Sequence, residues 1–276
     1  MENPILTSAC VSNEGSNPTK WMLLLHGVFG MGSNFRSFAR ALSARVPEWG
    51  FLLVDLRGHG ASQGFQPPHT LATAAEDISR LVTSLELPVV GIAGHSFGGK
   101  VTLAYLARRD RDLSNVFVLD SVPGARPNAS VTEDALRILR LLESIPQPLA
   151  SPEAFGEICE RAGLSKPITN WLAMNVRRSD DTYRIRLDLQ AIGAMLVDYY
   201  EHDYWDVIAD PTCSTRIDLV VGGASGHFAD ADLDRARALE GAGSHVHLSI
   251  LKGAGHWLHT DDPEGLLDVM ATALRY

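Results

Sequence analysis

Short apolar runs recur along the chain, most of them bounded by glycine or by polar residues. They are WMLLLH (21–26), FLLVD (51–55), VVGIAG (89–94), VFVLD (116–120), IDLVVGG (217–223) and VHLSIL (246–251). Runs of this length that are apolar at nearly every position are typical of strands covered on both faces. ILTSACV (5–11) predicts a further strand at an edge of the same sheet.

Segments with helical spacing separate most of these predicted strands. Apolar residues recur at intervals of three and four within 35–46, 71–85, 100–109 and 263–276, and Thr70 is placed to cap the second segment. Strands that alternate with helices predict an α/β fold, with a mainly parallel central sheet flanked by helices on both sides.

The alternation stops between about 124 and 212. We find helical spacing there, in 132–145, 152–163 and 187–208, but no strand-like run. We therefore expect residues 124–212 to form a helical cap, inserted over the ligand-binding edge of a core built from 1–123 and 213–276. Five aromatic residues of the insertion either line a pocket or hold the insertion onto the core: Trp171, Tyr199, Tyr200, Tyr204 and Trp205.

Composition narrows the range of partners and locations. The 276 residues carry a net charge of −9, which disfavours binding to nucleic acid. The N-terminal stretch lacks the pattern of a secretory signal, and no apolar segment is long enough to span a bilayer. Three widely spaced cysteines without a C-x-x-C pair fit free thiols in a reducing compartment, so we expect a cytoplasmic protein.

Residues 94–100, GHSFGGK, fit two different motifs. As G-x-x-x-x-G-K they resemble a phosphate-binding loop, but such a loop needs Ser or Thr directly after the lysine to ligate Mg²⁺. Val101 follows Lys100, and the hydroxyl of Thr102 comes one residue too late. We therefore reject nucleotide binding and expect Lys100 to be a solvated residue in the first turn of its helix.

As G-x-S-x-G, the same stretch places Ser96 at a turn between a predicted strand and a predicted helix. A serine at such a turn is exposed in a strained conformation, and Gly94 and Gly98 leave room for the close packing that the turn requires. The N-terminus of the following helix favours an anion forming nearby. Ser96 is therefore our candidate nucleophile.

A serine nucleophile needs a base and donors for an oxyanion. His256 lies in the loop after the last predicted strand, which a parallel sheet brings to the same edge as Ser96; His259 is the nearest alternative. We expect the backbone N–H of Phe97 to be one oxyanion donor. For the second we choose Val28, after His26-Gly27, with Phe29 as the alternative.

Several motifs in the same order resemble the α/β-hydrolase superfamily over almost the whole chain. They are LHGVFG (25–30), DLRGHGAS (55–62), GHSFGGK (94–100) and GAGHW (253–257). Together they are similar to small bacterial carboxylesterases related to the abhydrolase-domain-11 proteins. The resemblance implies hydrolysis of carboxylic esters under a helical cap, without cofactor or metal. Asp55, Arg57 and His59 are then expected to hold the loop beside the nucleophile.

The chain departs from the usual pattern of that superfamily at the acid of the triad. The resemblance places an Asp in G-x-x-D after the strand that follows the cap, but here Ser225 stands at that position. Asp120 ends the strand after the nucleophile helix, where some members of the superfamily carry the acid, and it is our candidate. Ser225 is then expected to be an auxiliary hydrogen-bonding residue. Asp218 begins its strand, and Asp230 and Asp232 fall in a predicted helix.

These assignments predict a serine hydrolase of short- to medium-chain carboxylic esters, with a small-molecule ester as its partner. The same residues would also serve a thioesterase, an amidase, a lactonase, a C–C bond hydrolase or a perhydrolase. Ser96 at the nucleophile position disfavours dehalogenases and epoxide hydrolases, which the resemblance associates with Asp there. A ligand receptor on a hydrolase scaffold is the alternative from another class, since this scaffold carries many functions.

Overall fold

A seven-stranded sheet organises the molecule. The computed structural model describes residues 4–127, 134–210, 212–241 and 243–275. The strands run in the order β1-β3-β2-β4-β5-β8-β9, and only the edge strand β1 is antiparallel to its neighbour. They are β1 Ser8–Val11, β2 Lys20–Leu25, β3 Trp49–Val54, β4 Val89–His95, β5 Asn115–Leu119, β8 Arg216–Gly222 and β9 Val246–Leu251. The predicted mainly parallel sheet with an edge strand at 5–11 is confirmed.

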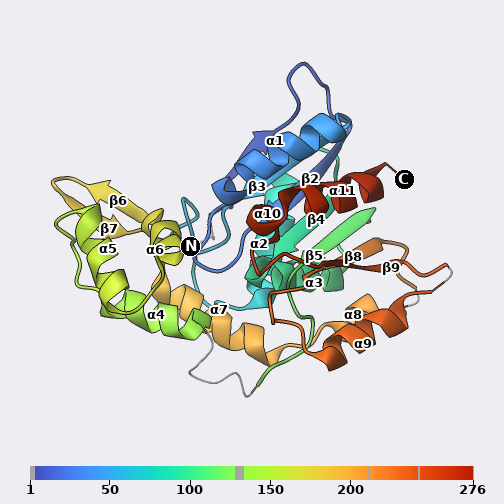
Figure 1. The fold of residues 1–276 in the computed structure, drawn as a ribbon. Helices are drawn as coiled ribbons and strands as arrows, with labels where there is room; N and C mark the ends of the chain where they lie inside the picture. Colours follow the sequence, from blue (N-terminus) through green and yellow to red (C-terminus); the bar gives the residue numbers. More distant parts are fainter. Residues whose placement is uncertain (1–3, 128–133, 211, 242, 276) are drawn as a thin grey trace.

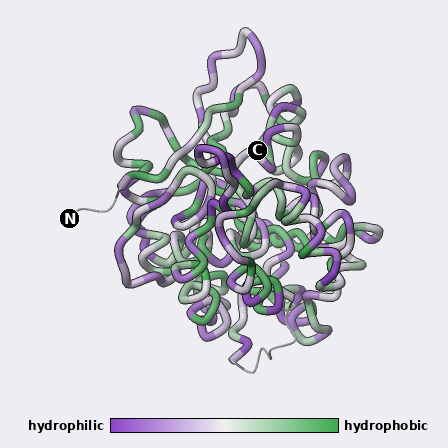
Figure 2. Tube along the Cα trace, turned by 90° about the vertical axis from the view of Figure 1, so that its left-hand side faces the viewer, coloured by the Kyte–Doolittle hydropathy of each residue, from purple (hydrophilic) through white to green (hydrophobic). Residues whose placement is uncertain are grey.

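Helices cover both faces of this sheet. The apolar side chains of β2 alternate between two buried clusters, Leu23 and Leu25 on one face and Met22 and Leu24 on the other. Figure 2 shows hydrophobic stretches gathered in the interior of the molecule. The core helices are the 3₁₀ helix η1 Gly32–Phe35, α1 Arg36–Arg45, α2 Leu71–Ser84, α3 Phe97–Arg108, α9 Asp230–Leu239, α10 Leu258–Asp261 and α11 Pro263–Leu274.

The predicted helices of the core match these elements closely. Thr70 caps α2 as expected, because its hydroxyl accepts a hydrogen bond from the Thr73 amide at 3.2 Å. Residue 276 of the predicted last helix lies outside the described residues. Over the described parts of the chain, no helix combines the length and the apolar character that a membrane span requires.

Residues 124–212, called the insertion, lie between β5 and β8 in the chain; α4, α5, α6, β6 and β7 stand together beside one end of the sheet, whereas α8 lies next to α9 (Figure 1). The predicted helix over 187–208 is divided into two, because the backbone becomes extended at His202. Residues 132–133 of the predicted helix over 132–145 lie outside the described part of the chain. The elements are α4 Asp134–Ser144, α5 Pro152–Arg161, α6 Lys166–Ala173, β6 Val176–Ser179, β7 Thr182–Ile185, α7 Leu189–Glu201 and α8 Trp205–Ile208.

The expectation of a strand-free insertion is wrong, because β6 and β7 form an antiparallel hairpin. Their sequences, VRRS and TYRI, are short and largely polar, so they lack the apolar run by which the core strands are recognised. Asp180 in the connecting turn has φ 53°, in the left-handed region that tight hairpin turns use.

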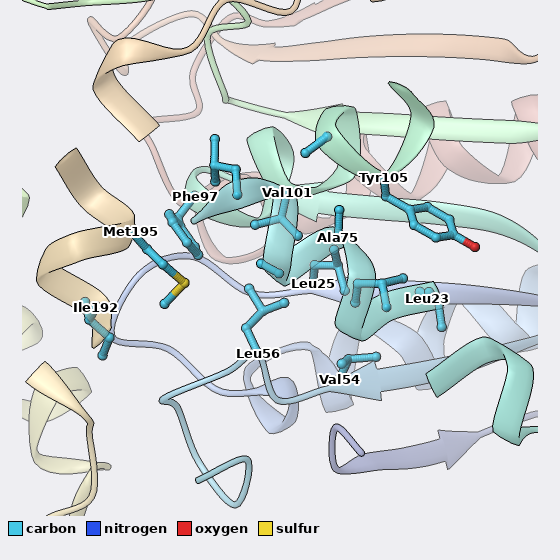
Figure 3. Close-up of a cluster of buried hydrophobic side chains, with 14 of the residues drawn as sticks. Leu23, Leu25, Val54, Leu56, Ala75, Phe97, Val101, Tyr105, Ile192 and Met195 are labelled. Carbon is cyan, nitrogen blue, oxygen red and sulfur yellow. The ribbon is translucent and has the colours of Figure 1, made fainter. Parts of the chain in front are cut away.

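The insertion shares one apolar cluster with the core. Ile192 and Met195 of α7 are buried with Phe97 and Val101 of α3, the helix that follows Ser96. Figure 3 shows these side chains continuing directly into the layer over the sheet. The insertion is therefore packed against α3 by buried apolar surface.

Candidate active site

Ser96 lies between β4 and α3 in a strained backbone conformation, with φ 52° and ψ −118°. The turn is possible because its neighbours lack side chains. A Cβ on Gly94 would lie 2.1 Å from the Gly98 carbonyl oxygen, and a Cβ on Gly98 would lie 2.6 Å from the carbonyl oxygens of Leu25 and His26. The strain therefore holds the serine at the carboxyl edge of the sheet.

His256 and Asp120 meet at the same edge. The Nδ1 atom of His256 lies 2.7 Å from Oδ2 of Asp120, although 136 residues separate them in sequence. Asp120 has a fully buried side chain and a left-handed backbone, with φ 44°, whereas a quarter of the His256 side chain is exposed. A buried carboxylate at Nδ1 orients an imidazole and leaves its Nε2 free to accept a proton.

The other oxygen of Asp120 is also held. Its Oδ1 accepts hydrogen bonds from the Gly222 amide at 2.9 Å and from the Ser225 hydroxyl at 3.0 Å. Ser225 is thus in direct contact with the carboxylate that contacts His256. Asp218, by contrast, pairs with Arg216 at 2.8 Å, and Asp230 and Asp232 lie in the first turn of α9.

His227, which our sequence analysis did not single out, belongs to the same cluster. Its ring stacks on that of His256, with centroids 3.9 Å apart and planes 13° from parallel, and its Nδ1 lies 3.8 Å from Oδ2 of Asp120. Burial and the charge of His256 lower the pKa of His227. One sequence signal could have identified His227: it lies two residues after Ser225, in the loop where the family resemblance places the acid of the triad.

Asp120, His227 and His256 place their potential ligand atoms within 4.8 Å of one another, the best grouping for a metal among the described residues. A metal ion lies close to the plane of each imidazole that binds it. The two rings are stacked and nearly parallel, so a single ion cannot lie in both planes. The arrangement suits an orienting carboxylate better than a chelate.

His95 precedes the serine and fixes the loop of His256. Its Nε2 donates a hydrogen bond to the His256 carbonyl oxygen at 2.7 Å. Burial, together with the nearby imidazoles His256 and His259, holds the pKa of His95 well below its usual value. The turn at Ser96 and the loop of His256 are thereby joined through one neutral side chain.

Two buried histidines support the loop after β2, where we expect the second oxyanion donor. Nε2 of His59 accepts a hydrogen bond from the Phe29 amide at 3.1 Å, and Nε2 of His26 accepts one from the Leu56 amide at 3.0 Å. Burial lowers the pKa of His26 to about 4 and that of His59 to about 3, so both rings stay neutral acceptors. The Phe29 amide, the alternative second donor, is thus engaged with His59.

The DLRGHG loop is held by buried polar contacts. Arg57 pairs with Asp77 at 2.6 Å, with both side chains almost fully buried. Asp55 accepts hydrogen bonds from the amides of Gly32 at 2.7 Å and Ala61 at 2.8 Å. These contacts fix the loops beside the nucleophile from the core side.

A cavity of about 810 Å³ lies between the core and the insertion. Ser96 and His256 both line it, as do the expected oxyanion residues Val28 and Phe97. Of the five aromatic residues considered in the insertion, Trp171, Tyr199 and Tyr200 line the cavity, whereas Tyr204 and Trp205 are buried and lie outside its lining. The insertion therefore provides one wall of the cavity and the core provides the other.

The expectation that Lys100 is solvated is wrong. Its side chain is only 1% exposed and extends toward the insertion, where backbone carbonyl groups accept its hydrogen bonds. Helical spacing could not reveal this, because the insertion that covers Lys100 comes from a distant part of the sequence.

Comparison with known proteins gives a consistent result. The alpha/beta hydrolase family matches residues 22–269. The zebrafish (Danio rerio) sn-1-specific diacylglycerol lipase ABHD11 is 25% identical over 95% of this chain and 80% of its own length. A marine microorganism esterase superposes with a TM-score of 0.81 at 22% identity, covering 97% of this chain and 98% of that one. A thioesterase domain from the curacin biosynthetic pathway superposes with a TM-score of 0.67 at 20% identity, covering 98% of this chain and 100% of that domain.

Proposed function

This chain belongs to the alpha/beta hydrolase family, and we propose that it is a serine hydrolase of short- to medium-chain carboxylic esters. The observation that carries the proposal is the 2.7 Å contact between His256 and the buried carboxylate of Asp120, in a cavity that Ser96 also lines. A base with its orienting acid, beside a serine at a strained turn, is the arrangement that acyl transfer needs.

In the proposed mechanism, the Oγ atom of Ser96 attacks the acyl carbon while Nε2 of His256 accepts its proton. The imidazolium that forms is stabilised by Asp120, which stays ionised. His256 then gives the proton to the alcohol oxygen as the C–O bond breaks. Water, deprotonated by the same imidazole, attacks the acyl-enzyme, and the acid leaves as Ser96 regains its proton.

The oxyanion of each tetrahedral intermediate would accept hydrogen bonds from the amides of Phe97 and Val28. Phe97 is the first residue of α3, so its N–H belongs to a helix N-terminus, where the helix dipole favours negative charge. Val28 lines the same cavity from the loop after β2, and the neighbouring Phe29 amide is held by His59.

The expected acyl preference follows from the wall of the cavity. Val122, Ile138 and Leu196 contribute apolar surface to the cavity that Ser96 lines, and the last two of them come from the insertion. Apolar side chains at a binding site favour alkyl groups by about 0.8 kcal/mol per methylene that they bury. We propose that the insertion acts as a cap over this acyl site.

The test is hydrolysis of p-nitrophenyl esters from acetate to dodecanoate by the wild type and by Ser96→Ala. We expect steady turnover with an optimum at short or medium chains, and loss of that turnover in the variant. Hydrolysis that the alanine leaves unchanged would contradict the proposal. Absence of turnover on every ester, with Ser96-dependent turnover of a thioester or lactone, would instead assign the same residues to that substrate class.

A further inference from the structure

Lys100 makes contacts that the proposed chemistry does not use. It is the fourth residue of α3, and its Nζ donates hydrogen bonds to three carbonyl oxygens: Gly124 at 2.9 Å, Tyr199 at 2.6 Å and His202 at 2.9 Å. Gly124 is the first residue of the insertion, and Tyr199 and His202 lie at the end of α7, from which the chain leads back toward the core through α8. These two segments are called the connections of the insertion. One ammonium group therefore binds both connections of the insertion.

The three acceptors match the protonated side chain. An ammonium group has three N–H donors and a neutral amine has two, so loss of the proton leaves one of the buried carbonyl groups without its donor. The face of the Tyr199 ring, 4.4 Å from Nζ, and the C-terminal end of α7 also favour a cation. Burial nevertheless lowers the pKa of Lys100 to about 8.

Other charges near Lys100 come from both connections. Asp203 and Asp198 favour the protonated amine, whereas Arg126 opposes it. Both acids are engaged elsewhere: Asp198 accepts a hydrogen bond from the Leu71 amide at 2.7 Å, and Asp203 accepts one from the Trp205 amide at 2.9 Å. Within the described part of the chain, the hydrogen bonds of the ammonium group are therefore to backbone carbonyl oxygens.

The two connections also bind each other around this lysine. The Arg126 amide donates to the Tyr200 carbonyl at 2.6 Å, and the Tyr204 amide donates to the Pro123 carbonyl at 3.0 Å. Tyr199 lines the cavity, and its ring lies 6.0 Å, centroid to centroid, from that of Phe97. The position of this cavity wall relative to the nucleophile turn thus depends on what holds the end of α7.

We infer that Lys100 is a positioning residue: its ammonium group holds both connections of the insertion to the nucleophile helix, and thereby sets the acyl site beside Ser96. Only the kinetic consequence of this inference rests on the proposed ester hydrolysis. Long acyl chains, which need the wall around Tyr199, should depend on Lys100 more than acetate does.

The first test compares Lys100→Met, which keeps the length and removes the charge, with the wild type and with Lys252→Met, a matched control at an exposed lysine. We expect Lys100→Met to lower the ratio of kcat/KM for p-nitrophenyl decanoate to that for acetate at least fivefold, mainly through KM. The control should keep the wild-type ratio. An equal loss on both esters, or no loss on either, would overturn the inference.

Hydrogen exchange gives a readout that does not depend on activity. In Lys100→Met the amides of Arg126 and Tyr204 should exchange at least tenfold faster, while those of β4 keep their protection. If the variant does not fold, the same measurement on the wild type tests the inference. As the pH rises from 7 to 9 and Lys100 loses its proton, the protection of these two amides, corrected for intrinsic exchange rates, should fall selectively. Unchanged or uniformly changed protection would overturn the inference. Failure of the ester proposal would appear separately, as turnover independent of Ser96.

Discussion

Asp120 holds three groups at once: the proposed base His256 on one oxygen, and the Gly222 amide and Ser225 hydroxyl on the other. Full burial of its side chain concentrates the effect of its charge on the imidazole beside it. The two polar neighbours on Oδ1 fix the carboxylate in the orientation that His256 requires. The unequal roles of these contacts can be separated by mutation.

Asp120→Asn keeps the shape of the side chain but removes the charge that would stabilise the imidazolium. We expect kcat for the best p-nitrophenyl ester to fall by about 10⁴, the loss typical of a triad acid. Ser225→Ala removes one of several hydrogen bonds to the carboxylate, so its loss should stay within about tenfold. Near-full activity in Asp120→Asn would show that this carboxylate is not the acid of the reaction.

At the scale of single residues, sequence reasoning reached the groups that follow strand ends. Ser96 is predicted from its G-x-S-x-G motif, His256 from its place after the last strand, and Asp120 from its strand end and the family resemblance. The structure places all three at the carboxyl edge of the sheet. Lys100 and His227 were not recognised, because their surroundings come from segments distant in sequence. No local pattern distinguishes a lysine covered by the insertion from one that faces water.

Elements of the core were predictable, since apolar runs specify strands that are buried on both faces. The hairpin β6–β7 was not, because its four-residue strands carry arginines and only Val176 and Ile185 among their residues are buried. The loops at the strand ends have a further property that sequence did not show. Their buried histidines serve as neutral hydrogen-bond acceptors for backbone amides.

The loops around His59 should make folding stability depend on pH. Burial gives His59 a pKa of about 3 in the folded state, below its ordinary value of 6.5, so the unfolded chain binds more protons at intermediate pH. Its contribution is therefore complete above pH 6.5 and is lost as the pH falls toward 3. Between pH 6.5 and 5 the loss is about 2 kcal/mol of unfolding free energy.

His59→Gln checks this dependence, because glutamine offers an acceptor oxygen to the Phe29 amide but does not titrate. Urea unfolding at pH 7 and pH 5 should show a smaller loss of stability in this variant than in the wild type, by about 2 kcal/mol. His247→Gln, at a partly exposed histidine of β9, should behave as the wild type does. An identical pH dependence in all three proteins would contradict a buried, neutral His59.

For the whole molecule, the important feature is a cavity whose walls come from two parts of the chain. The loops at the strand ends provide Ser96 and His256, the proposed reacting groups, and the insertion provides Ile138, Leu196 and three aromatic side chains. The acyl preference is therefore expected to reside in the insertion, and a change there should alter selectivity more than the rate on the smallest substrate.

Ile138→Trp enlarges a buried residue of α4 that lines the cavity. If it displaces two methylene groups of a bound chain, the ratio of kcat/KM for decanoate to that for butyrate should fall about tenfold. Val197→Trp introduces the same side chain on the exposed side of α7, where 57% of Val197 is accessible, and should leave the ratio unchanged. Equal ratios in both variants would place the acyl chain elsewhere.

The central claim, that Ser96 is the nucleophile activated by His256 and Asp120, is tested most directly by covalent labelling. The wild type would be treated with a fluorophosphonate, and the modified residue identified by peptide mass spectrometry while ester hydrolysis is followed. We predict a single adduct, on Ser96, forming in proportion to the loss of activity and much more slowly in Asp120→Asn. Full inactivation with the adduct on another residue, or full labelling of Ser96 with hydrolysis intact, would contradict the account.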